Sequence, residues 1–201
     1  MSMSFSSKKE RDEYIRADLF RYSGKSDKKT LKKYKKGFGG FQYTYCMRMC
    51  TWYSQCKDPF GRYVLYPYYK IREKRIGLKC GFEISEKTVI GKGLHIAHFS
   101  GVTVHIDAVL GDNVSVSTCT TIGQTLKDGK VLTPVIGNNV YIAPGARVIG
   151  PVRIGNNVAV GANAVVTHDL PDNAVAAGVP AKILNFDGAG DYILNPYSEE
   201  T

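Results

Sequence analysis

From Ile90 onward, an aliphatic residue recurs at about every sixth position of the chain. The hexads read IGKGLH (90–95) and IAHFSG (96–101) at the start, IGNNVY (136–141) after an interruption, and VTHDLP (166–171) at the end. A period of six fits neither an amphipathic helix nor a simple two-residue alternation, because small residues also mark each turn. The pattern is typical of a solenoid in which each hexad forms one short strand and one turn, and three hexads complete a triangular coil.

The leading aliphatic residue of each hexad is expected to point inward and to stack on its equivalent in the next coil, about 4.8 Å away. Coils that begin at Ile90, Leu110, Ile136 and Ile154 give this alignment. No single hexad can bury its apolar side, so the coils stabilise one another. The pattern therefore predicts a mostly β fold, a parallel β-helix of hexapeptide repeats over residues 80–186.

Two segments interrupt the period. Residues 102–109 contain two residues more than a hexad, and residues 123–135 are expected to leave the coil as an excursion loop. Insertions in solenoids gather on the binding face, although a surface loop can also lengthen without acquiring a function. Residues 187–201 follow the last repeat and are expected to form a loose C-terminal tail.

Residues 1–79 have no hexad pattern and are expected to form an α-helical region. Residues 8–24 have apolar side chains at helical spacing and a terminal glycine, residues 30–53 form a second stretch broken by glycines, and residues 59–76 form a third that opens at a proline. A helical region at this end of a solenoid is expected to cover the open coil and to assist oligomerisation.

Charge and aromatic residues are concentrated in this first region. The net charge is +9, and residues 1–79 contain 20 Lys and Arg against 7 Asp and Glu, with ten of the 13 tyrosines. We expect a solvated basic face, with contact to an anionic membrane surface or a polymeric glycan as the alternative, and no nucleic-acid partner, since no such fold signature is present.

The chain has no apolar stretch long enough to span a membrane and no apolar core of a secretory signal at its start. Its five cysteines are odd in number and irregularly spaced. These features predict a cytoplasmic protein with reduced thiols and no metal site.

Residues 80–184 resemble the catalytic domain of the serine O-acetyltransferases and the related sugar O-acetyltransferases. The likeness rests on three motifs, IGKGLHIAHFSGVTV with its histidine between small residues, TTIGQ, and AAGVPAKIL. The resemblance implies that the β-helix is left-handed, that acetyl-CoA is the acyl donor, and that a hydroxyl group is the acceptor. It also implies a homotrimer with its active sites between neighbouring subunits.

Acetyl transfer to an alcohol needs a base that takes the hydroxyl proton while the oxygen attacks the thioester carbonyl. Neutral imidazole suits this task near pH 7, so His98 is the predicted general base. The resemblance aligns Glu83 with the carboxylate that orients this imidazole, at a position where the family usually has Asp. The other histidines, His95, His105 and His168, are expected to be solvated turn residues.

Small residues are expected to stack one coil apart beyond the base, and to leave a trough for the pantetheine arm of CoA. Pro144 and Ala162 belong to this column. The resemblance places Thr167 and Lys182 near the nucleotide end, where Lys182 can meet a phosphate as a point charge. Backbone N–H groups near Gly123 are expected to stabilise the oxyanion.

Two positions differ from the serine enzymes, and both concern the acceptor. Ala97 stands where those enzymes have Asp before the histidine, and Thr133 stands where they have a second His before proline. A charged amino acid needs complementary partners when it is desolvated. The prediction is therefore an O-acetyltransferase acting on a hydroxyl of a sugar, glycan precursor or polysaccharide. The alternatives are a serine O-acetyltransferase and a non-catalytic β-helix that serves as an assembly protein.

Overall fold

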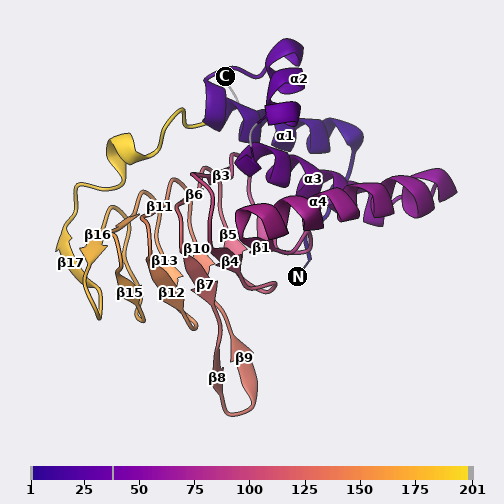
Figure 1. Ribbon diagram of the computed structural model, residues 1–201. Coiled ribbons are helices and arrows are strands. Elements are labelled where there is room, and N and C mark those ends of the chain that lie inside the picture. The colour runs from indigo at the N-terminus through magenta and orange to yellow at the C-terminus, as the bar shows by residue number, and fades with distance from the viewer. Residues whose placement is uncertain (1, 38, 199–201) are drawn as a thin grey trace.

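The computed structural model describes residues 2–37 and 39–198, and it consists of an N-terminal helical region followed by a parallel β-helix (Figure 1). The helical region contains α1 (Lys8–Ser23), α2 (Lys28–Gly37), α3 (Gly39–Ser54), the π-helical turn η1 (Gly61–Leu65) and α4 (Tyr66–Cys80). Ser7 accepts a hydrogen bond from the Glu10 N–H at the start of α1, and Gly24 ends this helix with φ 63°. The last helical run extends four residues beyond the predicted end at position 76.

Three sheets form the three sides of the β-helix. Sheet A contains, in spatial order, β1 (Phe82–Ile84), β4 (Val102–Val104), β7 (Thr121–Gly123), β12 (Arg147–Ile149) and β15 (Val165–Val166). Sheet B contains β2 (Val89–Ile90), β5 (Val109–Leu110), β10 (Val135–Ile136) and β13 (Arg153–Ile154). Sheet C contains β3 (His95–Ile96), β6 (Ser115–Val116), β11 (Tyr141–Ile142), β14 (Ala159–Val160), β16 (Val175–Ala177) and the antiparallel strand β17 (Lys182–Asn185).

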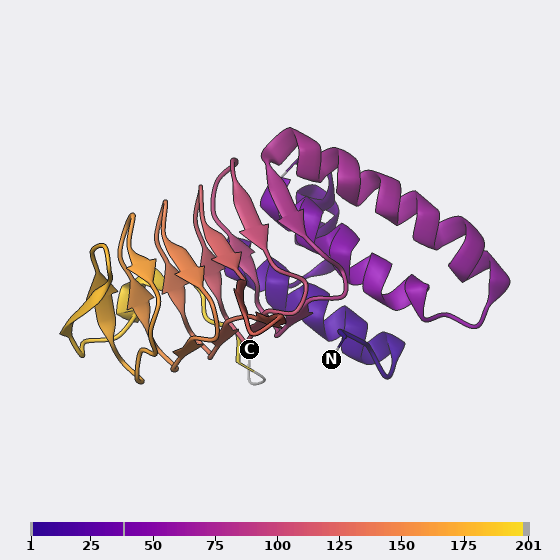
Figure 2. The same ribbon diagram turned by 90° about the horizontal axis from the view of Figure 1, so that it is seen from below.

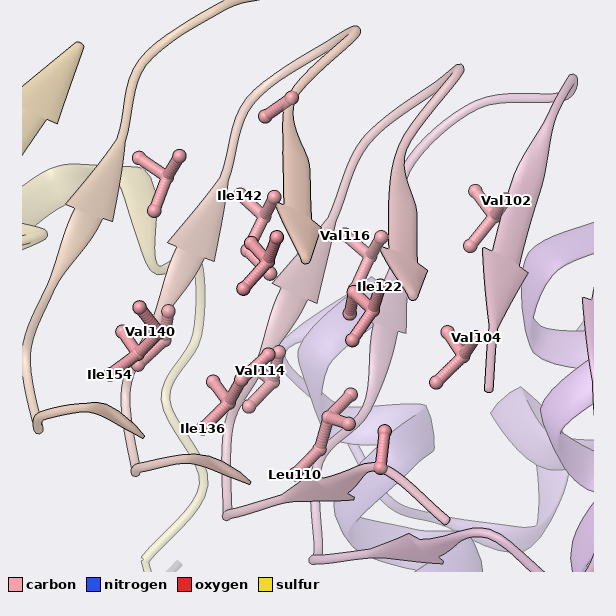
Figure 3. Close-up of a cluster of buried hydrophobic side chains, with 14 of the residues drawn as sticks. Val102, Val104, Leu110, Val114, Val116, Ile122, Ile136, Val140, Ile142 and Ile154 are labelled. Atoms are coloured by element: carbon pink, nitrogen blue, oxygen red, sulfur yellow. The ribbon is translucent and has the colours of Figure 1, made fainter. Parts of the chain in front are cut away.

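The strand register confirms the predicted coil starts. Ile90 pairs with Leu110, Leu110 with Ile136, and Ile136 with Ile154, and all four side chains are 3% exposed or less. The side chains of Leu110, Ile136 and Ile154 point into the prism (Figure 3). Together with Ile90 and the inward side chains of sheets A and C, they belong to one continuous hydrophobic core. The predicted left-handed β-helix is confirmed.

The two extra residues of the first coil lie elsewhere than predicted. Val104, not Val102, pairs in register with the inward Ile122 of the next coil. Val104 therefore starts the hexad that ends before Leu110, and this hexad contains no insertion. The longer segment is the turn from sheet C to sheet A, residues 97–103, whose equivalent in the next coil is residues 117–121. The prediction was wrong because Val102 and Val104 are both apolar and both are buried, at 0% and 4% exposure.

The helices pack over the N-terminal end of the prism (Figure 2). The Tyr43 hydroxyl donates to the Ile84 carbonyl at 2.8 Å, and Arg48 donates to the Ile90 carbonyl at 2.9 Å. Arg48 also forms a fully buried ion pair with Asp18 of α1. Side chains of α3 and α4 therefore continue the apolar core of the first coil into the helical region.

Residues 124–134, one residue fewer at each end than predicted, leave the coil as a β-hairpin that projects from the prism (Figure 1). Its strands are β8 (Thr125–Lys127) and β9 (Lys130–Leu132). Asp128 and Gly129 at the tip both have positive φ, which matches the preference of two-residue hairpin loops for Asp-Gly. No helix in the described part of the chain is long and apolar enough to cross a bilayer.

The C-terminal segment (residues 187–198) is not the loose tail that the sequence suggests. It runs back from β17 along sheet C to α1 and contains the short helix η2 (Gly190–Tyr192) (Figure 1). Ala189 and Ile193 are buried, at 0% and 7% exposure, and the Leu194 carbonyl accepts a hydrogen bond from Arg21. Burial of apolar side chains on the outer face of sheet C therefore orders this segment. Residues 199–201 of the predicted tail lie outside the described residues.

Candidate active site

His98 lies in the enlarged turn of the first coil, at the edge where sheet C meets sheet A. We call the row of turns at residues 97–103, 117–121, 143–147 and 161–165 the C–A edge. His98 has φ 65° and Ser100 has φ 107°, conformations that are uncommon outside glycine and that cluster at functional sites. The His98 side chain is exposed. The added residues and the unusual backbone therefore coincide with the predicted base.

A cavity of about 290 Å³ opens beside this imidazole, and we call it the His98 pocket. The β-helix and the C-terminal segment both contribute walls. The lining residues from the β-helix are His95, Ala97, His98, Ser115, Ser117, Tyr141 and Pro144, and those from the C-terminal segment are Asp191, Tyr192 and Leu194. The sequence did not single out the three residues from the C-terminal segment, because no repeat relates this distant segment to the coils.

His95 is not the solvated turn residue that the sequence suggests. It lies on β3, and its ring packs against Tyr22 of α1, with the ring centroids 4.5 Å apart. Burial, together with the charges of Arg21 and His98, lowers the pKa of His95 to about 4, so this imidazole is neutral at pH 7. The sequence pattern marks His95 only as an outward strand position next to the inward Ile96, and gives no sign of the helix that covers it.

Glu83 lies on the other side of the C–A edge. It occupies an outward position of β1, pairs in register with Thr103, and is exposed. Its side chain lines a separate cavity of about 610 Å³ between α4 and sheet A, which Lys74 also lines. Within the described residues, no hydrogen bond joins Glu83 to His98, and the two do not line a common cavity. The orienting role of this carboxylate stays a prediction.

Three of the five predicted cofactor residues follow His98 along the C–A edge. The register of sheet C places Pro144 and Ala162 two and three coils beyond His98 in the same column, and Pro144 lines the His98 pocket. Lys182 pairs with Ala177 at the last coil, next to the same edge. Pro144 and Ala162 therefore lie in one column, and the role of these three residues in binding CoA stays a prediction.

The other two predicted cofactor residues lie on a different edge. Gly123 ends β7 at the base of the hairpin, and Thr167 follows β15. Both are in turns from sheet A to sheet B, the A–B edge, on the far side of sheet A from His98. Within a single chain, the predicted CoA-binding residues therefore lie on two different edges of the prism.

A triangular β-helix of hexapeptide repeats, with one exposed histidine beside a small pocket and a row of small residues, defines the class of hexapeptide-repeat transferases. Residues 133–168 match the family described as bacterial transferase hexapeptide (six repeats). The chain is 41% identical to a serine acetyltransferase of Staphylococcus aureus over 108 aligned residues. The alignment covers 54% of this chain and 51% of that relative. The chain thus spans about half the length of the curated relatives it matches.

Solved structures extend the similarity to the helical region. The serine acetyltransferase of Neisseria gonorrhoeae superposes with a TM-score of 0.72 and 27% identity, over 93% of this chain and 71% of that chain. Soybean serine acetyltransferase complexed with serine gives a TM-score of 0.69 and 30% identity, over 90% of this chain and 72% of that chain. The chain belongs to the hexapeptide-repeat acyltransferase family, in which it is similar to the serine acetyltransferases.

Proposed function

We propose that the chain is an acetyl-CoA-dependent O-acetyltransferase with L-serine as its acceptor and His98 as its general base. The observation that carries this proposal is the exposed imidazole of His98 in the widened turn of the C–A edge, beside a pocket of small-molecule size. The acceptor oxygen attacks the thioester carbonyl carbon as His98 takes the hydroxyl proton. The carbon–sulfur bond then breaks, and the CoA thiolate leaves and regains a proton from the imidazolium. No acyl-enzyme forms.

Serine replaces the sugar or glycan that Ala97 and Thr133 suggested from sequence. The relatives are named serine acetyltransferases, and one solved neighbour is complexed with serine. The volume of the His98 pocket, about 290 Å³, is near the lower limit of roughly 300 Å³ for small-molecule sites and suits an amino acid better than a glycan. The comparisons do not support the sugar prediction, and the serine alternative fits them better.

The acyl donor lies along the C–A edge, where Pro144, Ala162 and Lys182 follow the base. The chain acts as a homotrimer, in which the A–B edge of one copy faces the C–A edge of the next. A neighbouring copy then supplies Gly123 and Thr167 to the donor site. The division of the predicted CoA residues between two edges supports this assembly. The cytoplasm is the proposed compartment, since its redox state keeps free cysteines such as these reduced.

Release of free thiol from acetyl-CoA tests the activity. The His98→Ala variant should fold normally and lose about 10²- to 10⁴-fold in rate, the usual contribution of a general base. Tyr63→Ala is the control, because Tyr63 is 73% exposed on η1 and lies on neither of these edges of the β-helix. Near-normal turnover by His98→Ala would remove this residue as the base.

A panel of acceptors tests the substrate. It contains L-serine, free sugars, nucleotide sugars and oligosaccharides, and only L-serine is expected to release thiol at a substantial rate. Preference for a sugar would restore the acceptor predicted from Ala97 and Thr133. Absence of any thermal shift with CoA, together with no turnover, would instead favour the non-catalytic assembly protein.

A further inference from the structure

Arg21 of α1 is a buried cation directly behind the His98 pocket. Arg21 is 1% exposed. Its guanidinium donates three described hydrogen bonds, to the Leu194 carbonyl at 2.8 Å, the Gly93 carbonyl at 2.8 Å and the Ser115 Oγ at 2.7 Å. All three acceptors are neutral, and no ion pair joins Arg21 to a carboxylate within residues 2–37 and 39–198. Burial lowers the pKa of Arg21 to about 10, so it is still charged at neutral pH. The charge of Asp18 acts on Arg21 from a distance, but the Asp18 carboxylate is paired directly with Arg48. A buried cation without a direct ion-pair partner of its own favours a further anion nearby.

Ser115 lies between the Arg21 guanidinium and the pocket. Its side chain lines the cavity, the residue is only 2% exposed, and its Oγ accepts the Arg21 hydrogen bond. A hydroxyl that accepts one bond still has its own proton to donate, and no acceptor for that proton is found in the part of the chain described. Donation from the guanidinium polarises the Ser115 hydroxyl, which makes it a stronger donor toward an anion in the pocket.

Asp191 supplies the opposite charge. It is the only acidic side chain among the described residues that line the His98 pocket, and none of its described contacts is an ion pair or a side-chain hydrogen bond. Its segment is held against sheet C by the buried Ala189 and Ile193, and by stacking of Tyr192 on Tyr141. The carboxylate is therefore carried into the pocket wall by an anchored segment and is available to a cation.

We infer that the His98 pocket recognises a zwitterionic acceptor, with Asp191 binding its ammonium group and Ser115, supported by Arg21, binding its carboxylate. The inference deepens the proposed function and rests on it, because it states how this chain binds an α-amino acid although Ala97 lacks a charge. Arg21 is a positioning residue in this arrangement, since it acts through Ser115. Asp191 and Ser115 are the residues that determine acceptor specificity.

Binding of the acceptor without acetyl-CoA tests the role of Asp191. Calorimetry compares L-serine with 3-hydroxypropionate, which has the hydroxyl and the carboxylate but no ammonium group. Asp191→Asn should weaken L-serine binding by about 10- to 100-fold, the usual loss when a hydrogen bond to a charged group is removed, and leave 3-hydroxypropionate unaffected. Asp191→Glu should restore most of the L-serine affinity. Asp187→Asn is the matched control, because Asp187 is exposed in the same segment and lies outside the pocket.

A second variant tests the carboxylate partner. L-serinamide keeps the ammonium and the hydroxyl but has no carboxylate, so the unmodified protein should bind it more weakly than L-serine. Ser115→Ala should abolish most of this preference and leave the affinity for L-serinamide itself unchanged. A purely structural role for Ser115 would lower both affinities together, and thermal melting of each variant verifies that it is folded.

The outcomes separate this inference from the proposed function. Equal L-serine affinity in Asp191→Asn and Asp187→Asn, or equal losses for L-serine and 3-hydroxypropionate, would overturn the inference even if thiol release with serine is normal. Failure of the unmodified protein to bind L-serine would overturn it as well. Charge-selective binding without any thiol release would support the inference and contradict the proposed transferase activity.

Discussion

The phenol ring of Tyr192 stacks on the ring of Tyr141, with centroids 4.9 Å apart and planes inclined by 13°. This contact joins η2 of the C-terminal segment to β11 in the middle of sheet C. Both residues line the His98 pocket. The ring pair therefore adds to the buried Ala189 and Ile193 in holding the side wall of the candidate acceptor site, between positions 51 apart in the sequence.

Tyr192→Ala should weaken both the fold and the acceptor site. An aromatic pair contributes about 0.5–1.5 kcal/mol, so the free energy of unfolding should fall by about 1 kcal/mol. The KM for L-serine should rise several-fold because the neighbouring Asp191 loses its support, while the KM for acetyl-CoA stays constant. Urea unfolding and initial-rate kinetics measure the two effects. Tyr63→Ala is the control, because Tyr63 is 73% exposed on η1; an equal loss of stability in this variant would contradict a specific role for the ring pair.

The half-buried imidazole of His95 should make stability depend on pH. Its folded-state pKa of about 4 lies below the value near 6.5 of an unfolded chain, so the unfolded state binds more protons between these two values. Stability is therefore fully present above pH 6.5 and is lost as the pH falls toward 4. At about 1.4 kcal/mol per pH unit, the contribution lost by pH 4.5 is about 2–3 kcal/mol.

A variant isolates this contribution. Urea unfolding of the unmodified protein and of His95→Gln at pH 7 and pH 4.5 gives the change in each, and other titrating groups contribute equally to both. The unmodified protein should lose about 2–3 kcal/mol more than the variant between these pH values. Parallel losses in the two proteins would show that His95 does not titrate as a buried group.

The repeat in the sequence was sufficient to predict the coils, and the reason is visible in the core. Each hexad begins with an inward aliphatic residue, so Ile90, Leu110, Ile136 and Ile154 can be aligned from the sequence although a longer turn and a hairpin lengthen two of the coils. The helix α1 was also predictable, because Gly24 gives a local stop signal. The insertion in the first coil was misplaced because the choice between Val102 and Val104 depends on pairing with other strands, which a local pattern does not contain.

The candidate site was predictable only where it follows the repeat. His98 and Pro144 fall in one column because the hexads stack, and a column can be counted in sequence. Arg21, His95 and Asp191 come together only because α1 and the C-terminal segment pack on the outer face of sheet C. Neither segment has a periodic signal that relates it to the hexads, so this wall of the pocket could not be inferred from residue spacing.

The turn that carries His98 should be sensitive to a single methyl group below it. Gly81 and Gly129 both have φ 71°, but a Cβ at Gly81 would lie 2.6 Å from the Gly101 nitrogen, whereas a Cβ at Gly129 would have no heavy atom within 4 Å. Gly129→Ala should cost only the left-handed conformation, about 1–2 kcal/mol. Gly81→Ala should cost about 1–3 kcal/mol more from overpacking, and should also lower kcat because the turn must shift.

Urea unfolding and initial-rate kinetics of these two glycine variants give the comparison. The difference between them isolates the clash, since both variants carry the same backbone penalty. Equal stability of Gly81→Ala and Gly129→Ala would show that the first coil can shift without cost. An unchanged kcat in Gly81→Ala would show that packing at Gly81 does not affect the position of His98.

The β8–β9 hairpin should be required for assembly but not for folding. Leu126 and Val131 are paired across β8 and β9, and they are 67% and 48% exposed, which places two apolar side chains in solvent in a single copy. In the proposed homotrimer, the A–B edge that carries this hairpin meets the C–A edge of the next copy, and contact there would bury both side chains.

The double variant Leu126→Ser and Val131→Ser should therefore change the free energy of unfolding of a single chain by no more than about 0.5 kcal/mol, as expected for exposed positions. Sedimentation velocity should show dissociation of the trimer, and thiol release should fall with it because the donor site loses Gly123 and Thr167 of the neighbouring copy. A variant that stays trimeric and fully active would contradict a role for the hairpin at the interface.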